Sequence, residues 1–418
     1  MVSKASLLTD QDCVDIAKPD SAGPAMLAPP PIGRSRKRSD LSVLIDFWKL
    51  RLGAGRLSLN EYFELRLFDE QLYRGADKKS FVGLEAARRI WFRSNYRVDL
   101  FAIASNKIAS TIWFAAHGLP VLPTVALYHE DVGRPSGRLL RDEAELRAFL
   151  KDAGNYPLFG KPIEGSRSIG SSSIECYVES NDNLITTAGR LISLNDFVSF
   201  IKSNAASGYL FQSRVSPHAA VREVCGDRLA TVRLLTILRG GKPEVLRACW
   251  KIPGGEQAAD NFWRQGNLLA QLDLDSGRVR RVIRGSSYKY EEVTHHPDSG
   301  VRILGMNVPN WDKVTELAME GAKLLPELPL VGWDIAPIDA GAVLVEPNVT
   351  PDFQLHQLAD RRGIVEPALT SFLQQRKQDA STYLRAGKPR SRLSFLRDRA
   401  KEAVEILGPN KYLRQPSS

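Results

Sequence analysis

The chain has 418 residues, of which 43% are hydrophobic and 25% are charged. These proportions are typical of a soluble globular protein and exclude a wholly disordered chain. The length is sufficient for two or three domains and for a large core without disulfides. No apolar run approaches the roughly 20 residues that a membrane-spanning helix needs.

The first residues and the cysteines indicate a reducing environment. The segment after Met1 leads into Asp10, Asp12 and Asp15 without an apolar stretch, so we expect no secretory signal. The four cysteines lie far apart, with no pairing typical of a zinc site or a disulfide framework: Cys13, Cys176, Cys225 and Cys249. We therefore expect a cytoplasmic protein.

The net charge of +9 is concentrated at the C-terminal end of the chain. Residues 385–418 contain nine Lys or Arg and three Asp or Glu, a balance of +6, which leaves +3 for the rest. No RNA-binding aromatic motif, zinc finger or recognition helix accompanies these charges. We expect no nucleic-acid partner.

In chain order, residues 1–40 contain a proline run and the basic cluster 34–38 without apolar periodicity, which predicts a disordered leader. Residues 41–105 have helical periodicity and form a helical N-terminal region. From 106 to 208, helices and strands alternate. The expected elements are helices at 107–117, 142–152 and 193–204, and strands at 124–128 and 157–162.

Strands dominate the next region, 209–380, as far as residue 284. The later expected elements are a helix at 309–325, strands at 330–337 and 342–349, and a helix at 366–384. Residues 381–418 form a basic tail. The pattern predicts an α+β protein with a helical N-terminal region and a helical C-terminal tail.

The most informative stretch is 332–348, where Asp339-Ala340-Gly341 is a turn signal between two apolar strands. A hairpin centred on Ala340 pairs residues whose numbers sum to 680, so Asp334 faces Glu346. The roots of the two side chains are then ~5 Å apart. Asn348 lies two residues beyond Glu346 and on the same face of the hairpin.

Two carboxylates and an amide oxygen on one face form an all-oxygen site, the kind that holds Mg²⁺ with nucleotide phosphates. Without a cation, the paired carboxylates would repel and one would stay protonated. The alternative is an exposed hairpin face that carries acids without a function. The same register predicts four apolar side chains on the opposite face, in a core: Trp333, Ile335, Val343 and Val345.

A second motif combines a lysine with a Gly/Ser-rich loop. Lys161 ends an apolar segment, and the loop 164–173, with two Gly and five Ser, follows it directly. A lysine on a strand reaches a phosphate as a point charge, while backbone N–H groups of such a loop close over it. The loop is not a Walker A motif, because the lysine precedes the glycines. A solvated linker is the alternative interpretation.

Two further cations, Arg233 and Lys107, are candidate phosphate contacts. Arg233 lies within the apolar segment 230–237. Burying a guanidinium there costs free energy unless an anion pairs with it. A phosphate fits this role, and a structural carboxylate is the alternative. Lys107, at the start of the predicted helix 107–117, could add a second ammonium near Lys161, although a lone lysine there is also an ordinary surface residue.

Taken together, these motifs resemble the ATP-grasp superfamily, and more closely its sugar-transfer-associated branch, over about residues 41–380. The joint order of the motifs is more specific than any single one. The stretches that carry the resemblance are Ala230-Thr231-Val232-Arg233, Asp260-Asn261-Phe262, 295–300, Pro309-Asn310-Trp311, 331–336 and Glu346-Pro347-Asn348.

The resemblance implies an ATP-grasp fold, with ATP gripped between two α+β lobes formed by 106–208 and 209–380. It implies that Lys161 and Arg233 are catalytic, with Arg233 touching the γ-phosphate. Segment 210–215 would be the hinge beside the adenine. The implied nucleotide-binding set is Lys107, Lys161, Gly165, Ser166, Gly170, Ser171, Gln212, Val215 and Arg233, and the implied magnesium ligands are Asp334, Glu346 and Asn348.

The expected activity is an ATP- and Mg²⁺-dependent carboxylate–amine (or carboxylate–thiol) ligase acting through an acyl phosphate. Its substrate would be a small or sugar-linked molecule in cell-surface polysaccharide or related biosynthesis. The alternatives are a kinase that phosphorylates a hydroxyl and a nucleotide-binding accessory protein with little catalysis. Candidate acceptor-site residues lie between the hinge and the hairpin: Arg247, Lys251, Asn261, His295 and His296.

The basic tail has its own pattern. Within 391–407, apolar residues recur at helical spacing and four basic residues lie largely off that stripe, which predicts a basic amphipathic helix. Such helices lie on anionic membranes, so peripheral contact with the inner membrane face is one expectation. Packing of the stripe against the protein itself or a second subunit is the alternative.

Overall fold

The computed structural model describes residues 40–73, 77–129, 137–163, 170–187, 189–204, 208–255, 259–285 and 290–386. The predicted leader, up to residue 39, and the tail from residue 387 onward lie outside these residues. Among the described residues, no helix is both long and apolar enough to cross a membrane.

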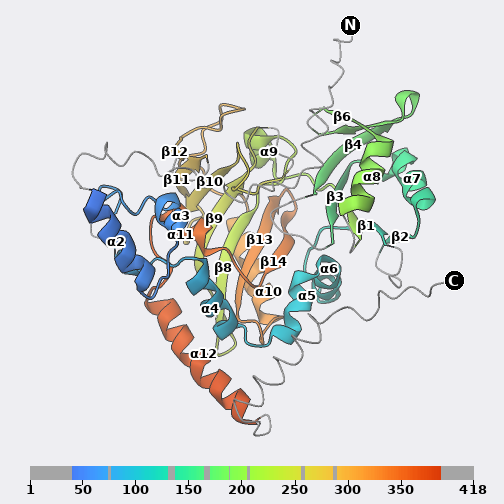
Figure 1. Cartoon of the computed structure of the whole chain (residues 1–418). Coiled ribbons are helices and arrows are strands. Elements are labelled where there is room, and N and C mark those ends of the chain that lie inside the picture. The colour runs from blue at the N-terminus through green and yellow to red at the C-terminus, as the bar shows by residue number, and fades with distance from the viewer. Residues whose placement is uncertain are drawn as a thin grey trace, which may run out of the picture.

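Two seven-stranded sheets organise the described chain, and they lie side by side in Figure 1. The first has the order β2-β1-β7-β3-β4-β5-β6 and the second β12-β11-β10-β9-β8-β13-β14. The first contains β1 (Thr124–Tyr128), β2 (Arg138–Leu140), β3 (Leu158–Pro162), β4 (Ser172–Val178), β5 (Asn183–Thr186), β6 (Leu191–Ser193) and β7 (Tyr209–Ser213). The second contains β8 (Val232–Arg239), β9 (Lys242–Ile252), β10 (Leu268–Leu272), β11 (Val279–Arg284), β12 (Glu291–Glu292), β13 (Leu330–Ile338) and β14 (Gly341–Asn348).

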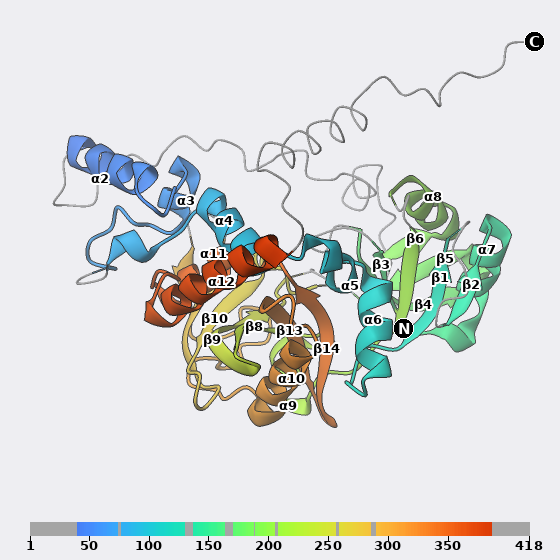
Figure 2. The ribbon, with the colours of Figure 1, turned by 90° about the horizontal axis from the view of Figure 1, so that it is seen from below.

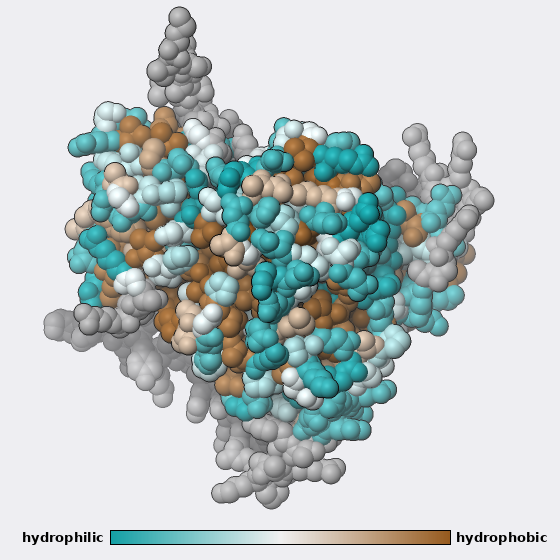
Figure 3. Space-filling model, turned by 180° about the vertical axis from the view of Figure 1, so that it is seen from behind, coloured by the Kyte–Doolittle hydropathy of each residue, from teal (hydrophilic) through white to brown (hydrophobic). Residues whose placement is uncertain are grey.

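Helices cover both sheets. The helices are α2 (Asp40–Leu52), α3 (Leu59–Glu64), α4 (Leu84–Ser94), α5 (Phe101–Ser105), α6 (Lys107–Ala116), α7 (Glu143–Lys151), α8 (Leu194–Asn204), α9 (Ala219–Cys225), α10 (Trp311–Lys323), α11 (Phe353–Asp360) and α12 (Pro367–Ala386). In Figure 2, α4, α11 and α12 lie on one side of the second sheet, and α9 and α10 lie on the other. The face seen from behind carries hydrophobic residues interspersed with hydrophilic ones (Figure 3). The predicted α+β architecture with a helical N-terminal region is confirmed.

The boundary between the lobes differs from the sequence-based one. β7 pairs with β1 and β3, so it belongs to the first sheet, although we assigned residues 209–380 to the second lobe. A run of strands does not show in its sequence which strand joins which sheet. The lobes meet at a bridge between Val121 and Leu344 and at a hydrogen bond from the His218 N–H to the Pro337 carbonyl.

The predicted pairing of Asp334 with Glu346 is present, but the turn and the strand register that produce it differ from the prediction. The turn has two residues, Asp339 and Ala340, because Ile338 pairs with Gly341. Next to the turn the paired numbers therefore sum to 679. A β-bulge between Ile335 and Asp334 then adds one residue on β14 and restores the predicted register.

The bulge also corrects the predicted faces of β14. Leu344, and not Val343 or Val345, joins Trp333 and Ile335 in the core beneath α10. Val343 and Val345 pack with Ala336 on the opposite face. The prediction for these two valines was wrong because strict alternation breaks at a bulge.

A buried asparagine fixes the helical N-terminal region to the second sheet. The Asn95 amide donates to the carbonyls of Leu330 (2.8 Å) and Val349 (2.9 Å), and its oxygen accepts from the Leu330 N–H (3.1 Å). Gln357 of α11 likewise exchanges two hydrogen bonds with the backbone of Val82. These contacts hold α4 against the strands that carry Asp334 and Glu346.

Asn95→Ala should lower the free energy of unfolding by about 3 kcal/mol, because it leaves buried backbone groups unpaired at the ends of β13 and β14. Asn155→Ala is the matched control, because Asn155 is only half-buried and donates one hydrogen bond, to the Phe149 carbonyl. Urea denaturation measures both. Equal losses in the two variants would contradict the clamping role of Asn95.

Candidate functional site

Four charged side chains form a buried network on one face of the second sheet. Arg233 of β8 binds Asp334 of β13 through two hydrogen bonds, one of them 2.6 Å long between Nη2 and Oδ2. Lys251 of β9 lies 3.1 Å from Asp334 Oδ2 and 3.4 Å from Asp260 Oδ1. All four are more than nine-tenths buried. The chain thus places two cations and two carboxylates in a dry environment, each with a partner.

The strand register explains this convergence. Asp334 pairs with Arg233 on one side and with Glu346 on the other, so the three side chains share a face across β8, β13 and β14. Arg233 also pairs with Cys249, and Lys251 lies two residues further along β9, on that same face. Charged side chains of four neighbouring strands, β9, β8, β13 and β14, therefore lie close together on one face of the second sheet.

The network sets the charge state of its members. Burial alone raises the pKa of Asp334, but the adjacent Arg233 and Lys251 outweigh burial and hold that pKa below its usual range. Burial lowers the pKa of Lys251, whereas Asp260 and Asp334 raise it, with a net increase. Asp334 is therefore a carboxylate and Lys251 an ammonium at neutral pH.

Asp334, Glu346 and Asn348 offer a donor set that fits Mg²⁺. Glu346 is half-buried, and its carboxylate forms no hydrogen bond or ion pair with any described residue. Asn348 pairs with Gly332, two positions from Asp334, and its buried Nδ2 has no hydrogen-bond partner among the described residues. The Glu346 carboxylate, beside the fixed carboxylate of Asp334, suits a hard cation with oxygen ligands. Asn348 would contribute its amide oxygen, since the unpaired Nδ2 is a hydrogen-bond donor and not a metal ligand.

Lys161 brings a charge from the first sheet toward this hairpin. It lies on β3 and is only 6% exposed, and its ammonium has no hydrogen-bond or ion-pair partner among the described residues. Burial lowers its pKa to about 8, Glu346 and Asp334 raise it, and Lys107 lowers it. The Lys161 ammonium therefore lies within electrostatic range of Glu346, Asp334 and Lys107. A buried amine without an anion is costly unless a ligand supplies one.

The other candidate nucleotide contacts lie near Lys161 and the junction of the two sheets. Lys107 begins α6 and donates to the Ile163 carbonyl at 3.1 Å, next to the end of β3. Gln212 of β7 donates to the Leu122 carbonyl, while its buried Oε1 accepts from no described residue. Val215 packs against the cluster of Leu122, Ala336 and Val343, in which Ala336 lies on the face of β13 that carries Asp334. These positions surround the junction of the two sheets.

The glycine-rich loop is described only in part. Gly165 and Ser166 lie outside the described residues. Gly170 has a left-handed φ of +76°, and its carbonyl accepts from the Tyr209 hydroxyl at 3.0 Å. A Cβ at Gly170 would lie 2.9 Å from Pro162 Cγ, so only glycine fits there without a shift. Ser171 is half-buried and precedes β4.

Sequence reasoning missed the roles of Lys251 and Asp260 in the network. A signal for Lys251 was present, because Arg247 and Lys251 are four residues apart in an apolar strand, an even spacing that places both cations on one face. Asp260 also accepts hydrogen bonds from the backbone N–H and hydroxyl of Thr231. It lies in a loop between β9 and β10, where no sequence periodicity indicates the direction in which its side chain points.

The histidines of the sequence occupy separate environments. His295 is exposed beside Thr294, whereas His296 is buried and lies 2.8 Å from the Pro253 carbonyl, so the two serve no common centre, as predicted. His356 of α11 is fully buried, and neither of its ring nitrogens has a hydrogen-bond partner in the described part of the chain. Burial, together with Arg233 and Arg247, lowers its pKa to about 3, so this ring is neutral.

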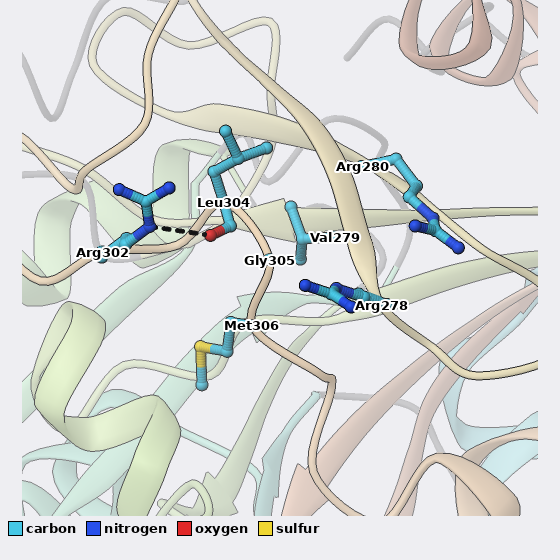
Figure 4. A pocket seen from close by; sticks show the side chains of 7 residues that line it. All are labelled: Arg278, Val279, Arg280, Arg302, Leu304, Gly305 and Met306. Carbon is cyan, nitrogen blue, oxygen red and sulfur yellow. Dashed lines mark hydrogen bonds between the residues drawn. The ribbon is translucent and has the colours of Figure 1, made fainter.

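A separate open pocket of about 560 Å³ lies at the β10–β11 turn (Figure 4). It contains none of the predicted site residues. Its lining residues are Arg278, Val279, Arg280, Arg302, Leu304, Gly305 and Met306. The Arg302 Nε donates to the Leu304 carbonyl at 3.3 Å, which is the dashed contact in the figure.

Arg233→Met should destabilise the protein by about 3–5 kcal/mol, because it removes one cation from a buried network and leaves Asp334 with Lys251 alone. Arg222→Met is the matched control, since Arg222 forms an exposed ion pair with Asp227. Thermal and urea denaturation measure both variants. A stability of Arg233→Met equal to that of the control would refute the role of this ion pair in the fold.

Comparison with known proteins identifies the family. Among curated proteins, none matches the sequence. Similar solved structures include L-amino acid ligase from Bacillus licheniformis (9% identity, TM-score 0.31), biotin carboxylase from Campylobacter jejuni (10%, 0.38) and D-alanine-D-alanine ligase from Coxiella burnetii (12%, 0.36). The matches cover 59%, 66% and 69% of this chain but 40%, 49% and 63% of those chains, less than two thirds of each. Residues 87–372 match the family described as sugar-transfer associated ATP-grasp, and the chain belongs to that family.

Proposed function

We propose that this protein is an ATP- and Mg²⁺-dependent ligase that joins a carboxylate to an amine or a thiol. The observation that carries the proposal is the approach of a buried, unpartnered lysine of the first sheet to the carboxylates of the β13–β14 hairpin. Such an arrangement suits a triphosphate, whose oxygens bind an ammonium on one side and a metal ion on the other.

The first lobe would hold the nucleotide. Lys107 and Lys161 would bind phosphate oxygens, under the loop that contains Gly165, Ser166, Gly170 and Ser171. At the junction of the sheets, the unpaired Gln212 Oε1 could accept from the adenine amino group, beside the apolar Val215. ATP binding would thereby satisfy the groups that have no partner within the described protein.

The second lobe would hold the metal. Asp334, Glu346 and Asn348 would bind Mg²⁺, which neutralises charge on the phosphates. Arg233 and Lys251 keep Asp334 ionised and fix its direction. Two nitrogens of Arg233, Nε and Nη2, are bound to Asp334, and its Nη1 binds no carboxylate of the described residues, so that nitrogen is available for the γ-phosphate.

The proposed chemistry has two steps. A carboxylate oxygen of the substrate attacks the γ-phosphorus, the bond from that phosphorus to the β–γ bridging oxygen breaks, and ADP leaves. An amine nitrogen or thiol sulfur then attacks the acyl carbon, phosphate leaves and the attacking atom loses a proton. No side-chain nucleophile is needed, and positioning and electrostatics carry the rate. We further propose a sugar-linked substrate, in cell-surface polysaccharide or related biosynthesis; the family's description as sugar-transfer associated supports only the link to sugar transfer.

The reaction type can be tested by its products. A thermal-shift screen with ATP and amino acids or acidic sugars first selects substrates, and ADP release is then measured with hydroxylamine present. A ligase yields a hydroxamate of the carboxylate, because hydroxylamine traps the acyl phosphate. A stable phosphoester would instead identify a kinase, and nucleotide binding without either product would identify an accessory protein.

Glu346→Gln should lower Mg²⁺-dependent turnover by about 100-fold or more, because it removes a metal ligand whose carboxylate has no other described partner. Its melting temperature should be unchanged, which separates it from Asp334→Asn, where an ion-pair network is also disturbed. Glu320→Gln, on the exposed face of α10, is the control. Near-normal turnover in Glu346→Gln would remove this residue from the metal site.

ATP affinity should fall as the pH rises above about 8, because the unbound protein then loses the proton of Lys161. The dissociation constant should increase by up to about tenfold per pH unit, the limit for one linked proton. Lys161→Met should bind ATP more weakly at every pH and lose this dependence. Isothermal titration calorimetry below and above pH 8 measures the dissociation constant of ATP for both proteins. An identical pH profile in the variant would exclude Lys161 as the titrating group.

A further inference from the structure

Helix α2 presents an unusual surface. Five large apolar side chains on it are exposed by 47–69%, and they form one stripe along three turns: Leu41, Leu44, Ile45, Trp48 and Leu52. The opposite face is buried, with Val43, Phe47 and Leu50 in the core beneath it. A helix that is apolar on both faces has a second surface to cover.

The rest of the described surface does not share this property. Twelve large hydrophobic side chains are exposed in the described part of the chain, and five of them belong to α2. Helix α10 has the same length, yet its exposed residues are all charged: Asp312, Lys313, Glu316, Glu320 and Lys323. On α2, Lys49 is the one charged residue of 41–52 that is exposed; Asp46 pairs with Lys78 and Arg51 pairs with Glu85.

We propose that α2 docks on an anionic membrane surface, lying in its plane with the stripe in the lipid. The stripe contains a tryptophan, whose amphipathic ring is favoured at the membrane interface. The sequence supplies the complementary charge, since Arg34, Arg36, Lys37 and Arg38 directly precede the helix. Basic residues beside an apolar helical face are typical of helices that bind anionic lipid.

The position of α2 permits this contact. In Figures 1 and 2, α2 lies at the end of the molecule away from the first lobe, so a flat surface can reach it without meeting that lobe. The helix also precedes residues 87–372, the part shared with the family. A second copy of the chain fits less well, because a stripe of five side chains is small against the roughly 20–30 residues per side of a standard interface.

The test uses the full chain and sedimentation with vesicles. An equimolar mixture of phosphatidylcholine and phosphatidylglycerol should bind the protein, high salt should weaken binding, and phosphatidylcholine alone should bind less. Leu44→Glu combined with Trp48→Glu should abolish binding and leave the melting temperature unchanged, because both side chains are exposed. Leu191→Glu combined with Leu274→Glu is the matched control, at exposed apolar positions on other elements, and should bind normally.

Four outcomes would overturn the proposal. The natural chain would fail to bind vesicles, or the α2 double variant would bind as well as the control. A chain shortened after Leu384 that loses binding, while the α2 variant keeps it, would assign attachment to the basic tail instead. A dimer in light scattering that the α2 variant dissociates, without vesicle binding, would identify a second copy as the occupant.

Discussion

The buried ion pair between Arg233 and Asp334 is the interaction on which the site depends. Desolvating two charges is expensive, and only good geometry and further hydrogen bonds compensate for it. Here Lys251 and Asp260 extend the pair into a network of two cations and two carboxylates, and Thr231 donates hydrogen bonds to the Asp260 carboxylate. The result is an ionised Asp334 held in one orientation, beside a Glu346 that remains open to a ligand.

The helices on both faces of β13 bury this ion-pair network. β13 is buried along nearly its whole length because α10 covers one face while α4, α11 and α12 cover the other (Figure 2). Low polarity around the charges strengthens their mutual attraction and keeps water from competing. The N-terminal helices thus contribute to the site without touching a ligand, through contacts such as those of Asn95 and Gln357.

Much of this could be predicted from the sequence, because periodicity and turn signals are local. The facing of Asp334 and Glu346, the helix 107–117 and the helix 193–204 all followed from short patterns, and the structure contains them. The assignment of β7 to the first sheet, the partner of Arg233 and the approach of Lys161 to the hairpin are non-local. They depend on which strands pair across long separations, which one sequence does not encode in any local pattern.

The bulge on β14 has a consequence for how such sites vary between proteins. The turn at Asp339 and Ala340 lies several residue pairs from the carboxylates, so its length is not dictated by the chemistry. Insertions or deletions at that tip would change the count of residues between Asp334 and Glu346, yet leave their pairing intact as long as the bulge adjusts the ladder. A search for related sites by fixed spacing would therefore miss proteins that share the geometry, whereas a search by strand pairing would find them.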